Sequence, residues 1–213
     1  MGCGASKDDV ANSSEHQNKY RVLKRKINWA EINSKLATEK TNDAKQKRLD
    51  LFIKMDKNEN GFLSLEEIEK VLIKEVLSEA QQVFDLKPII ARSFQKAKSL
   101  NPVGRSKGGD NQIEKNEFRM LLIYLKNFMA IWEIFAKAND ADDRRIDRVR
   151  FRGIFPRVQE WAPQFLSGDE CWDAMMAQAV TGEGGGNLIL FTDFAFWVLE
   201  REIGSYIENP EDE

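Results

Sequence analysis

The chain contains little of the chemistry on which most enzymes and secreted proteins depend. Its 213 residues include two cysteines, five prolines and a single histidine. The cysteines, Cys3 and Cys171, are far apart in the sequence, which argues against a disulfide framework and predicts a reducing compartment. The histidine, His16, lies in a polar segment near the start, so a histidine-based triad and a zinc cluster are excluded. We therefore expect a protein that is not an enzyme.

Long apolar runs are also missing. A membrane-spanning helix needs ~18 consecutive apolar residues. The richest run, from Met120 to Phe135, is interrupted by Lys126 and Glu133. The N-terminus lacks the apolar core of a secretory signal, and the net charge of −3 is too small to favour nucleic acid as a partner. Membrane contact is therefore expected only through a covalent lipid or through the protein surface.

The first seven residues, MGCGASK, match the pattern for N-terminal myristoylation. Gly2 would carry the myristoyl group on its α-amine, and Cys3 beside it would take palmitate as a second anchor, because one myristoyl chain binds a bilayer only marginally. The basic segment Lys19 to Lys26 would add roughly 1 kcal/mol per residue at the inner, anionic leaflet. The alternatives are a chance match in an unstructured tail and, for the basic segment, a solvated helix face.

From about residue 28 onwards the apolar residues recur at helical spacing, and evenly spaced strand signals are absent. The sequence predicts an all-α EF-hand fold with four helix–loop–helix units in two paired lobes. The predicted parts are a flexible acylated tether (1–27), an N-terminal pair (28–125), a C-terminal pair (126–207) and an acidic tail (208–213).

Two helices illustrate the predicted pattern. One is capped by Thr41 or Asn42 and runs to Met55, with Leu49, Phe52 and Ile53 expected on its buried side. The other is one long or kinked helix over 117–138, a stretch without glycine or proline. Asp85 is expected to cap a helix between these two.

One loop, from Asp56 to Glu67, matches the twelve-residue calcium pattern at every defining position. Gly61 at the sixth place permits the sharp turn that brings the donors together. The predicted calcium ligands are Asp56, Asn58, Asn60, Phe62 through its carbonyl oxygen, Ser64 and Glu67. Only Asp56 and Glu67 are charged, so we expect sensor-range affinity with a dissociation constant on the order of 10⁻⁶ to 10⁻⁵ M. The alternative is a solvated polar turn.

Three further loops are degenerate. EF-hands pair through the residue at the eighth place, and Leu63, Ile113, Ile146 and Ile189 are expected at that place in the four units. The second loop keeps Glu117 at the twelfth place but has Ser106 at the first place and no glycine at the sixth, which predicts weak or no calcium binding.

The third and fourth loops have lost their ligands. Arg150 occupies the twelfth place of the third loop, where a cation excludes calcium. The arginines of this loop are expected to pair with its own acids; an anion or lipid contact is the alternative. The fourth loop, over 182–193, is glycine-rich and is interpreted as a collapsed calcium loop rather than a phosphate loop, because it lacks the Gly-Lys-Ser/Thr ending.

Taken together, these features resemble the flagellar calcium-binding proteins, or calflagins. The similarity is strongest at Glu39-Lys40-Thr41, Ala44 to Arg48 and Leu51-Phe52, and it recurs at Glu117-Phe118-Arg119 and near Trp197. The resemblance implies acylation at Gly2 and Cys3, residence at the flagellar membrane and calcium-dependent membrane association. This sequence departs from the family in its third and fourth loops, which are the family's usual calcium sites.

Two functions follow as hypotheses. The first is a calcium sensor held at the cytosolic face of the flagellar membrane, acting on an unidentified protein partner. The second is a calcium-insensitive adaptor of the flagellum. Four methionines, Met120, Met129, Met175 and Met176, would line a partner groove under the first hypothesis or belong simply to the core.

Overall fold

The computed structural model describes residues 27–82, 84–100, 109, 111–139, 144–178 and 187–202. The predicted tether, apart from residue 27, and the acidic tail lie outside these ranges. Within them the elements in chain order are α2 (Trp29–Leu36), α3 (Asn42–Met55), β1 (Leu63–Ser64), α4 (Leu65–Val71), the π-helical turn η1 (Leu72–Val76), the 3₁₀ turn η2 (Ala80–Gln82), α5 (Leu86–Ser99), β2 (Gln112–Ile113), α6 (Lys115–Ala138), β3 (Arg145–Asp147), α7 (Arg148–Val158), α8 (Gly168–Gln178), β4 (Leu188–Leu190) and α9 (Phe191–Glu202). The predicted all-α EF-hand fold is confirmed.

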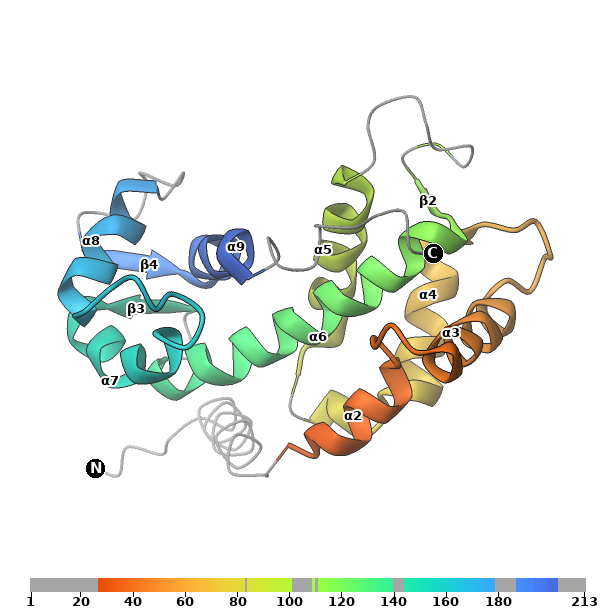
Figure 1. Ribbon diagram of the computed structural model, residues 1–213, viewed down its shortest axis with the longest axis horizontal. Coiled ribbons are helices and arrows are strands. Elements are labelled where there is room, and N and C mark those ends of the chain that lie inside the picture. The colour runs from red at the N-terminus through yellow and green to blue at the C-terminus, as the bar shows by residue number, and fades with distance from the viewer. Residues whose placement is uncertain are drawn as a thin grey trace, which may run out of the picture.

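Helix α6 is the central element of the molecule. It runs between one group of helices, α2 to α5, and a second group, α7 to α9 (Figure 1). Its 24 residues continue without a break through residues 125 and 126, where the sequence analysis placed the boundary between lobes. The single predicted helix over this region is confirmed, whereas the domain boundaries stay a prediction.

Two short antiparallel sheets pair the loops. In the first, β1 and β2 place Leu63 opposite Ile113; in the second, β3 and β4 place Ile146 opposite Ile189. All four side chains are at most 1% exposed. The predicted pairing at the eighth place is therefore confirmed in both halves. It follows from burial, because the one apolar residue that each loop points inward meets its counterpart across the sheet.

The predicted capping hydrogen bond is present at α3 and absent at α5. At α3, Thr41 is the N-cap and its hydroxyl accepts a hydrogen bond from the Ala44 backbone at 3.2 Å, as predicted. Asp85 lies at the N-cap of α5, but its side chain makes no cap hydrogen bond. Its carboxylate instead lies 3.5 Å from the Arg144 guanidinium, so the predicted capping role is wrong.

The buried face of α3 also differs from the expected one. Ala44, Arg48, Phe52 and Met55 are buried, whereas Leu49 is 38% exposed and Ile53 is 58% exposed. The prediction was correct for Phe52 and wrong for the other two. The reason is that a 3.6-residue period allows only one stripe to face α6, and the position at the centre of that stripe is taken by Arg48, which sequence reasoning treats as polar.

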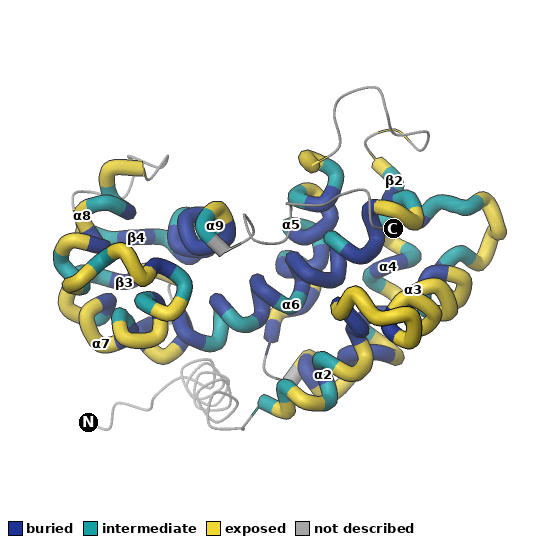
Figure 2. Tube along the Cα trace, viewed as in Figure 1, coloured by how far each residue is buried: buried dark blue, intermediate teal, exposed yellow. Residues whose placement is uncertain are grey.

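The core extends along α6 and includes side chains from both groups of helices (Figure 2). Phe52 and Phe118 meet edge to face with ring centroids 5.4 Å apart, and Phe135 lies 5.4 Å from Phe194 in the other half. Met129 and Met175 are fully buried, and Met120 and Met176 pack against the same cluster. The four methionines therefore belong to the core and do not form an open partner groove.

The turn between α2 and α3 is held by two arginines that are each 8% exposed. Ala37 adopts a left-handed conformation there, with φ of 46°. The Arg48 guanidinium donates to the Ala37 carbonyl at 2.6 Å and to the Glu39 carbonyl at 2.8 Å, and Arg119 donates to the Thr38 carbonyl at 3.1 Å. These bonds give partners to backbone carbonyls of the turn that follows α2. We name residues 37–39 the α2–α3 corner.

Candidate metal centre

The first loop begins where α3 ends. Asp56 is the C-cap residue of α3, and its backbone N–H donates to the Phe52 carbonyl at 2.9 Å. Its carboxylate turns back into the loop and accepts from the backbone of Asn60 at 3.1 Å and of Gly61 at 2.8 Å. One carboxylate thus holds the turn closed while keeping its oxygens inside it.

Two amides continue this arrangement. The side-chain oxygen of Asn58 accepts from the Asn60 backbone at 3.0 Å, and that of Asn60 accepts from the Phe62 backbone at 2.8 Å. Gly61 has φ of +80°, a conformation in which a Cβ would be strained. The predicted role of Gly61 in the turn is therefore confirmed by its backbone geometry.

Glu67 closes the loop from the first turn of α4. One of its carboxylate oxygens accepts from the Ser64 backbone at 2.9 Å and from the Ser64 hydroxyl at 2.7 Å, which completes a capping box. The other accepts from the Asn58 side-chain amide at 3.0 Å. The third and twelfth places of the loop therefore touch directly, although nine residues separate them.

The donor chemistry of this loop fits calcium. Carboxylate, amide, hydroxyl and carbonyl oxygens are the hard ligands that Ca²⁺ takes. Asp56 and Asn58 both accept from the Asn60 backbone N–H, and Asn58 in turn donates to Glu67. In the described part of the chain no three Asp, Glu, His or Cys side chains gather at one point. The loop would thus hold its ion with two carboxylates and neutral oxygens.

Comparison with known proteins decides the family of this half. Residues 32–125 match the family described as the FCaBP EF-hand domain. These residues are therefore similar to that domain.

Relatives extend beyond this domain. The chain is 28% identical to the flagellar calcium-binding protein of Trypanosoma cruzi, over 79% of this chain and 77% of that protein. It is 25% identical to the flagellar calcium-binding protein TB-24 of Trypanosoma brucei brucei, over 95% of this chain and 92% of the relative. A similar protein, TB-17, is 25% identical over 100% of this chain and 90% of its own length. The resemblance stated from the sequence is confirmed.

In the second hand of residues 32–125, a lysine side chain pairs with the carboxylate at the twelfth place of the loop. Glu117, at its twelfth place, is nearly buried and lies 2.8 Å from the ammonium of Lys98 on α5. The same carboxylate accepts from the Glu114 backbone at 2.8 Å. The oxygens that would take calcium are therefore engaged by an ammonium and a backbone N–H, which agrees with the expectation of weak or no binding. The lysine was missed from sequence because it is 19 residues away on another helix.

Among the described residues, the third loop has ion pairs both within the loop and to a neighbouring helix. Arg150 pairs with Asp147 at 3.8 Å, as expected within the loop. Arg148, however, contacts Asp169 at 3.5 Å and also Asp173, both on α8, so its predicted pairing with acids of the loop is wrong. Residues 140–143 lie outside the described residues, as do residues 179–186 of the fourth loop.

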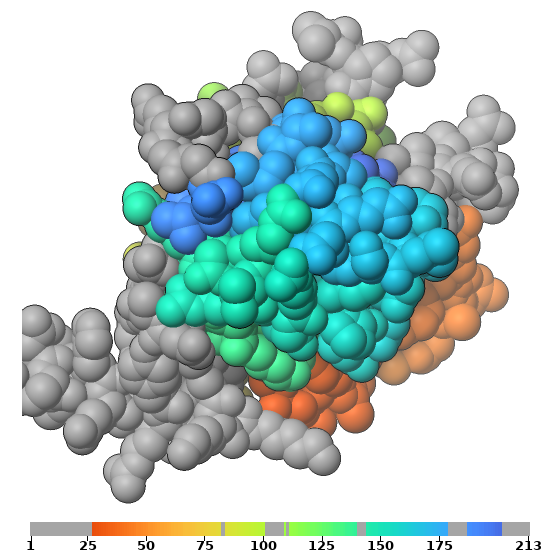
Figure 3. All heavy atoms as spheres, turned by 90° about the vertical axis from the view of Figure 1, so that its left-hand side faces the viewer, coloured from red at the N-terminus to blue at the C-terminus, as the bar shows by residue number. Residues whose placement is uncertain are grey.

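Helices α7 and α8 lie against each other on the face seen in Figure 3. Arg152 makes a bidentate pair with Asp169: its Nε donates to Oδ1 at 3.0 Å and its Nη2 donates to Oδ2 at 2.9 Å. This hydrogen bond, helped by the charges of Arg152 and Arg148, lowers the pKa of the Asp169 carboxyl. Arg148 and Arg152 therefore join α7 to α8, because folding brings the acidic side chains of α8 within reach of both arginines.

Gly2, Cys3 and the basic segment Lys19 to Lys26 lie outside the described residues. Within the described ranges, none of the helices is both long enough and apolar enough to cross a membrane.

Proposed function

We propose that this chain is a calcium-binding EF-hand protein of the flagellum, anchored to the membrane through Gly2 and Cys3, and that it senses calcium through the loop from Asp56 to Glu67. The family match, the names of the relatives and the oxygen-lined first loop support this proposal. Its site residues are Asp56, Asn58, Asn60, Phe62, Ser64 and Glu67.

The observation that carries the proposal is the direct contact between Asn58 and Glu67 across the loop. Glu67 belongs to α4, so an ion that replaces the Asn58 amide as its partner acts on the first turn of that helix. α4 continues into η1, a π-helical turn in which Leu77 donates to the Leu72 carbonyl at 2.7 Å. π-helical turns often occur at functional sites, and this one is where movement of α4 would reach α5.

The second candidate is a calcium-insensitive adaptor. The contact between Lys98 and Glu117 favours it, because a hand with its own ammonium does not need calcium to keep its shape. In this case the first loop would be held by its internal hydrogen bonds alone, and the protein would present a constant surface to its partner.

Isothermal titration calorimetry on the metal-free full chain separates the two functions. The sensor requires one calcium site with a dissociation constant on the order of 10⁻⁶ to 10⁻⁵ M. Glu67→Gln should abolish the heat, whereas Glu66→Gln, one residue away on the exposed side of α4, should leave it unchanged. Absence of heat from the unaltered protein would support the adaptor.

Acylation is tested separately. Mass spectrometry of the N-terminal peptide from native cells should show myristate on Gly2 and palmitate on Cys3. Gly2→Ala should remove both, because membrane contact through the first chain brings Cys3 to the enzymes that add the second, and a fluorescent fusion of this variant should leave the flagellar membrane. Normal membrane location of Gly2→Ala would overturn the anchoring proposal while leaving calcium binding intact.

A further inference from the structure

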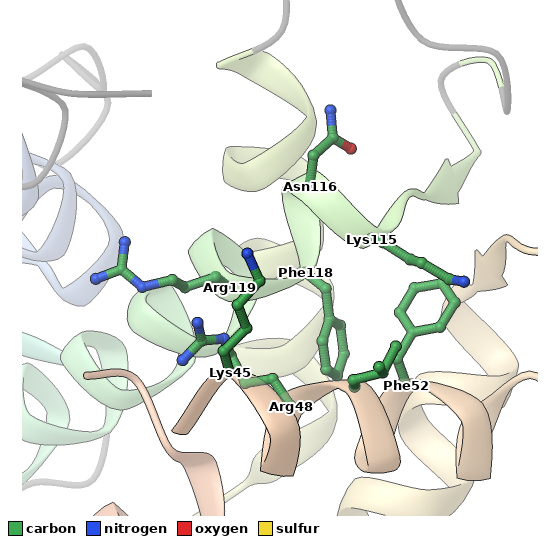
Figure 4. Close-up of a pocket in the computed structure, with 8 residues that line it drawn as sticks. Lys45, Arg48, Phe52, Lys115, Asn116, Phe118 and Arg119 are labelled. Atoms are coloured by element: carbon green, nitrogen blue, oxygen red, sulfur yellow. The ribbon is translucent and has the colours of Figure 1, made fainter. Parts of the chain in front are cut away.

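A half-open groove of about 340 Å³ lies between α3 and the first turns of α6. It is lined by Lys45, Arg48, Leu49, Phe52, Lys115, Asn116, Phe118 and Arg119. Figure 4 shows the basic groups of Lys45, Arg48 and Arg119 towards one end and Lys115 beside the Phe52 ring at the other. It is separate from the calcium loop, none of whose predicted ligands lines it.

The charge of the groove has one sign. Four of its eight lining residues are cationic and none is acidic. Arg48 and Arg119 are buried and hold the α2–α3 corner, so they contribute fixed positive charge to the floor. Lys45 and Lys115 are exposed, and among the described residues neither forms an ion pair. The ammonium of Lys115 lies 5.7 Å from the centre of the Phe52 ring, so its contact there is with the face of an aromatic side chain.

Apolar side chains continue the groove onto the surface. Phe52 and Phe118 form its wall, and Leu49 at its edge is 38% exposed. Ile53, one turn further along α3, is 58% exposed and continues the apolar strip on the surface. A ligand that fits this arrangement has an anionic group for the cations and an apolar part for Leu49 and Ile53.

We infer that this groove docks an anionic phospholipid of the bilayer. The headgroup phosphate would lie between Lys45 and Lys115, and the glycerol and upper acyl region would rest against Leu49 and Ile53. The α2–α3 corner ties the site to α2, which is the element that follows the proposed tether in the chain. The inference rests on the proposed membrane anchoring for its physiological setting, since the anchors would bring the folded domain to the bilayer.

The test uses unacylated full-length protein, made as Gly2→Ala, in vesicle co-sedimentation. Vesicles of phosphatidylcholine alone are compared with vesicles containing a minority of phosphatidylserine. Lys45→Glu with Lys115→Glu is the groove variant. Lys70→Glu with Lys87→Glu is the matched control: it makes the same change in net charge at exposed lysines of α4 and α5, outside the groove.

The groove variant should lose at least about tenfold in affinity for the anionic vesicles, because each lysine near such a surface contributes about fivefold. The control variant should stay within about threefold of the parent. Leu49→Ser with Ile53→Ser should also weaken binding, because the proposed ligand has an apolar part that rests on these side chains.

Equal losses in the groove and control variants would reduce the effect to general surface charge and overturn the inference. Unchanged binding by the groove variant would overturn it too, and would leave an acidic protein segment as the occupant of the groove. Because Gly2→Ala is present throughout, failure of this test is distinct from failure of the anchoring proposal.

Discussion

The Lys98 ammonium lies 2.8 Å from a carboxylate oxygen of Glu117, with the two side chains 9% and 2% exposed. Glu117 is at the twelfth place of a loop that has Ser106 at its first place and no glycine at its sixth. An EF-hand can therefore keep its carboxylate and its pairing strand while a lysine from the neighbouring helix supplies the positive charge. The relationship supplies the second hand with a positive charge from within the protein.

Lys98→Met should destabilise the protein strongly. It leaves the Glu117 carboxylate buried without its ammonium, which costs about 3–5 kcal/mol. Adding Glu117→Gln should recover most of the loss, because glutamine keeps an acceptor for the Glu114 backbone and carries no charge. Urea unfolding of the single and double variants measures both values. A single variant as stable as the parent would show that the pair contributes nothing.

Calcium should raise the thermal stability of the full chain. A ligand at 100 times its dissociation constant stabilises the folded state by about 2.7 kcal/mol, or roughly 5–10 °C in Tm for a chain of this size. Removing the metal with a chelator should reverse the shift. Glu67→Gln should show no shift in differential scanning fluorimetry, and an equal shift in that variant would place the calcium elsewhere.

The strand pair should couple the first loop to its neighbour. Leu63→Ala removes a fully buried side chain opposite Ile113 and should cost about 2–5 kcal/mol. It should also weaken calcium binding, because Leu63 lies between predicted ligands. Ile189→Ala, in the other sheet, should cost a similar amount by urea unfolding without changing the calcium affinity. Equal loss of calcium affinity in both variants would contradict the expectation that the two sheets act independently.

Cys171 should be chemically inert in the folded protein. Burial raises the pKa of its thiol to about 12, so at about pH 8 only about one molecule in ten thousand carries the reactive thiolate. Iodoacetamide should leave the Cys171 peptide unmodified in native buffer and modify it in concentrated guanidinium chloride, as read by mass spectrometry. Rapid native modification would mean that α8 opens readily.

Much of the fold could be predicted because it depends on local chemistry. Thr41 caps α3, Gly61 makes the turn of the loop, and helical periodicity indicates α6. The pairing of Leu63 with Ile113 and of Ile146 with Ile189 was also predictable, because an EF-hand repeat places one apolar residue at the same step of every loop.

Other features depend on which helices meet. Leu49 and Ile53 are exposed because Arg48 turns inward to the α2–α3 corner, and no pattern of apolar residues indicates that an arginine will be buried. Arg148 and Arg152 pair with acids on α8, and Lys98 pairs with Glu117. Helical periodicity relates only residues a few positions apart, so it does not predict these pairs.

The sequence by itself determined the helices, the turn of the first loop and the residues at which the loops pair, and it predicts the six oxygen donors of that loop. These follow from backbone conformation and from residues a few positions apart. Only the tertiary structure decided which charges neutralise one another and which face of α3 carries a basic, apolar groove. The physical reason is that burying a charge requires a partner, and that partner is chosen by the packing of helices distant in the chain.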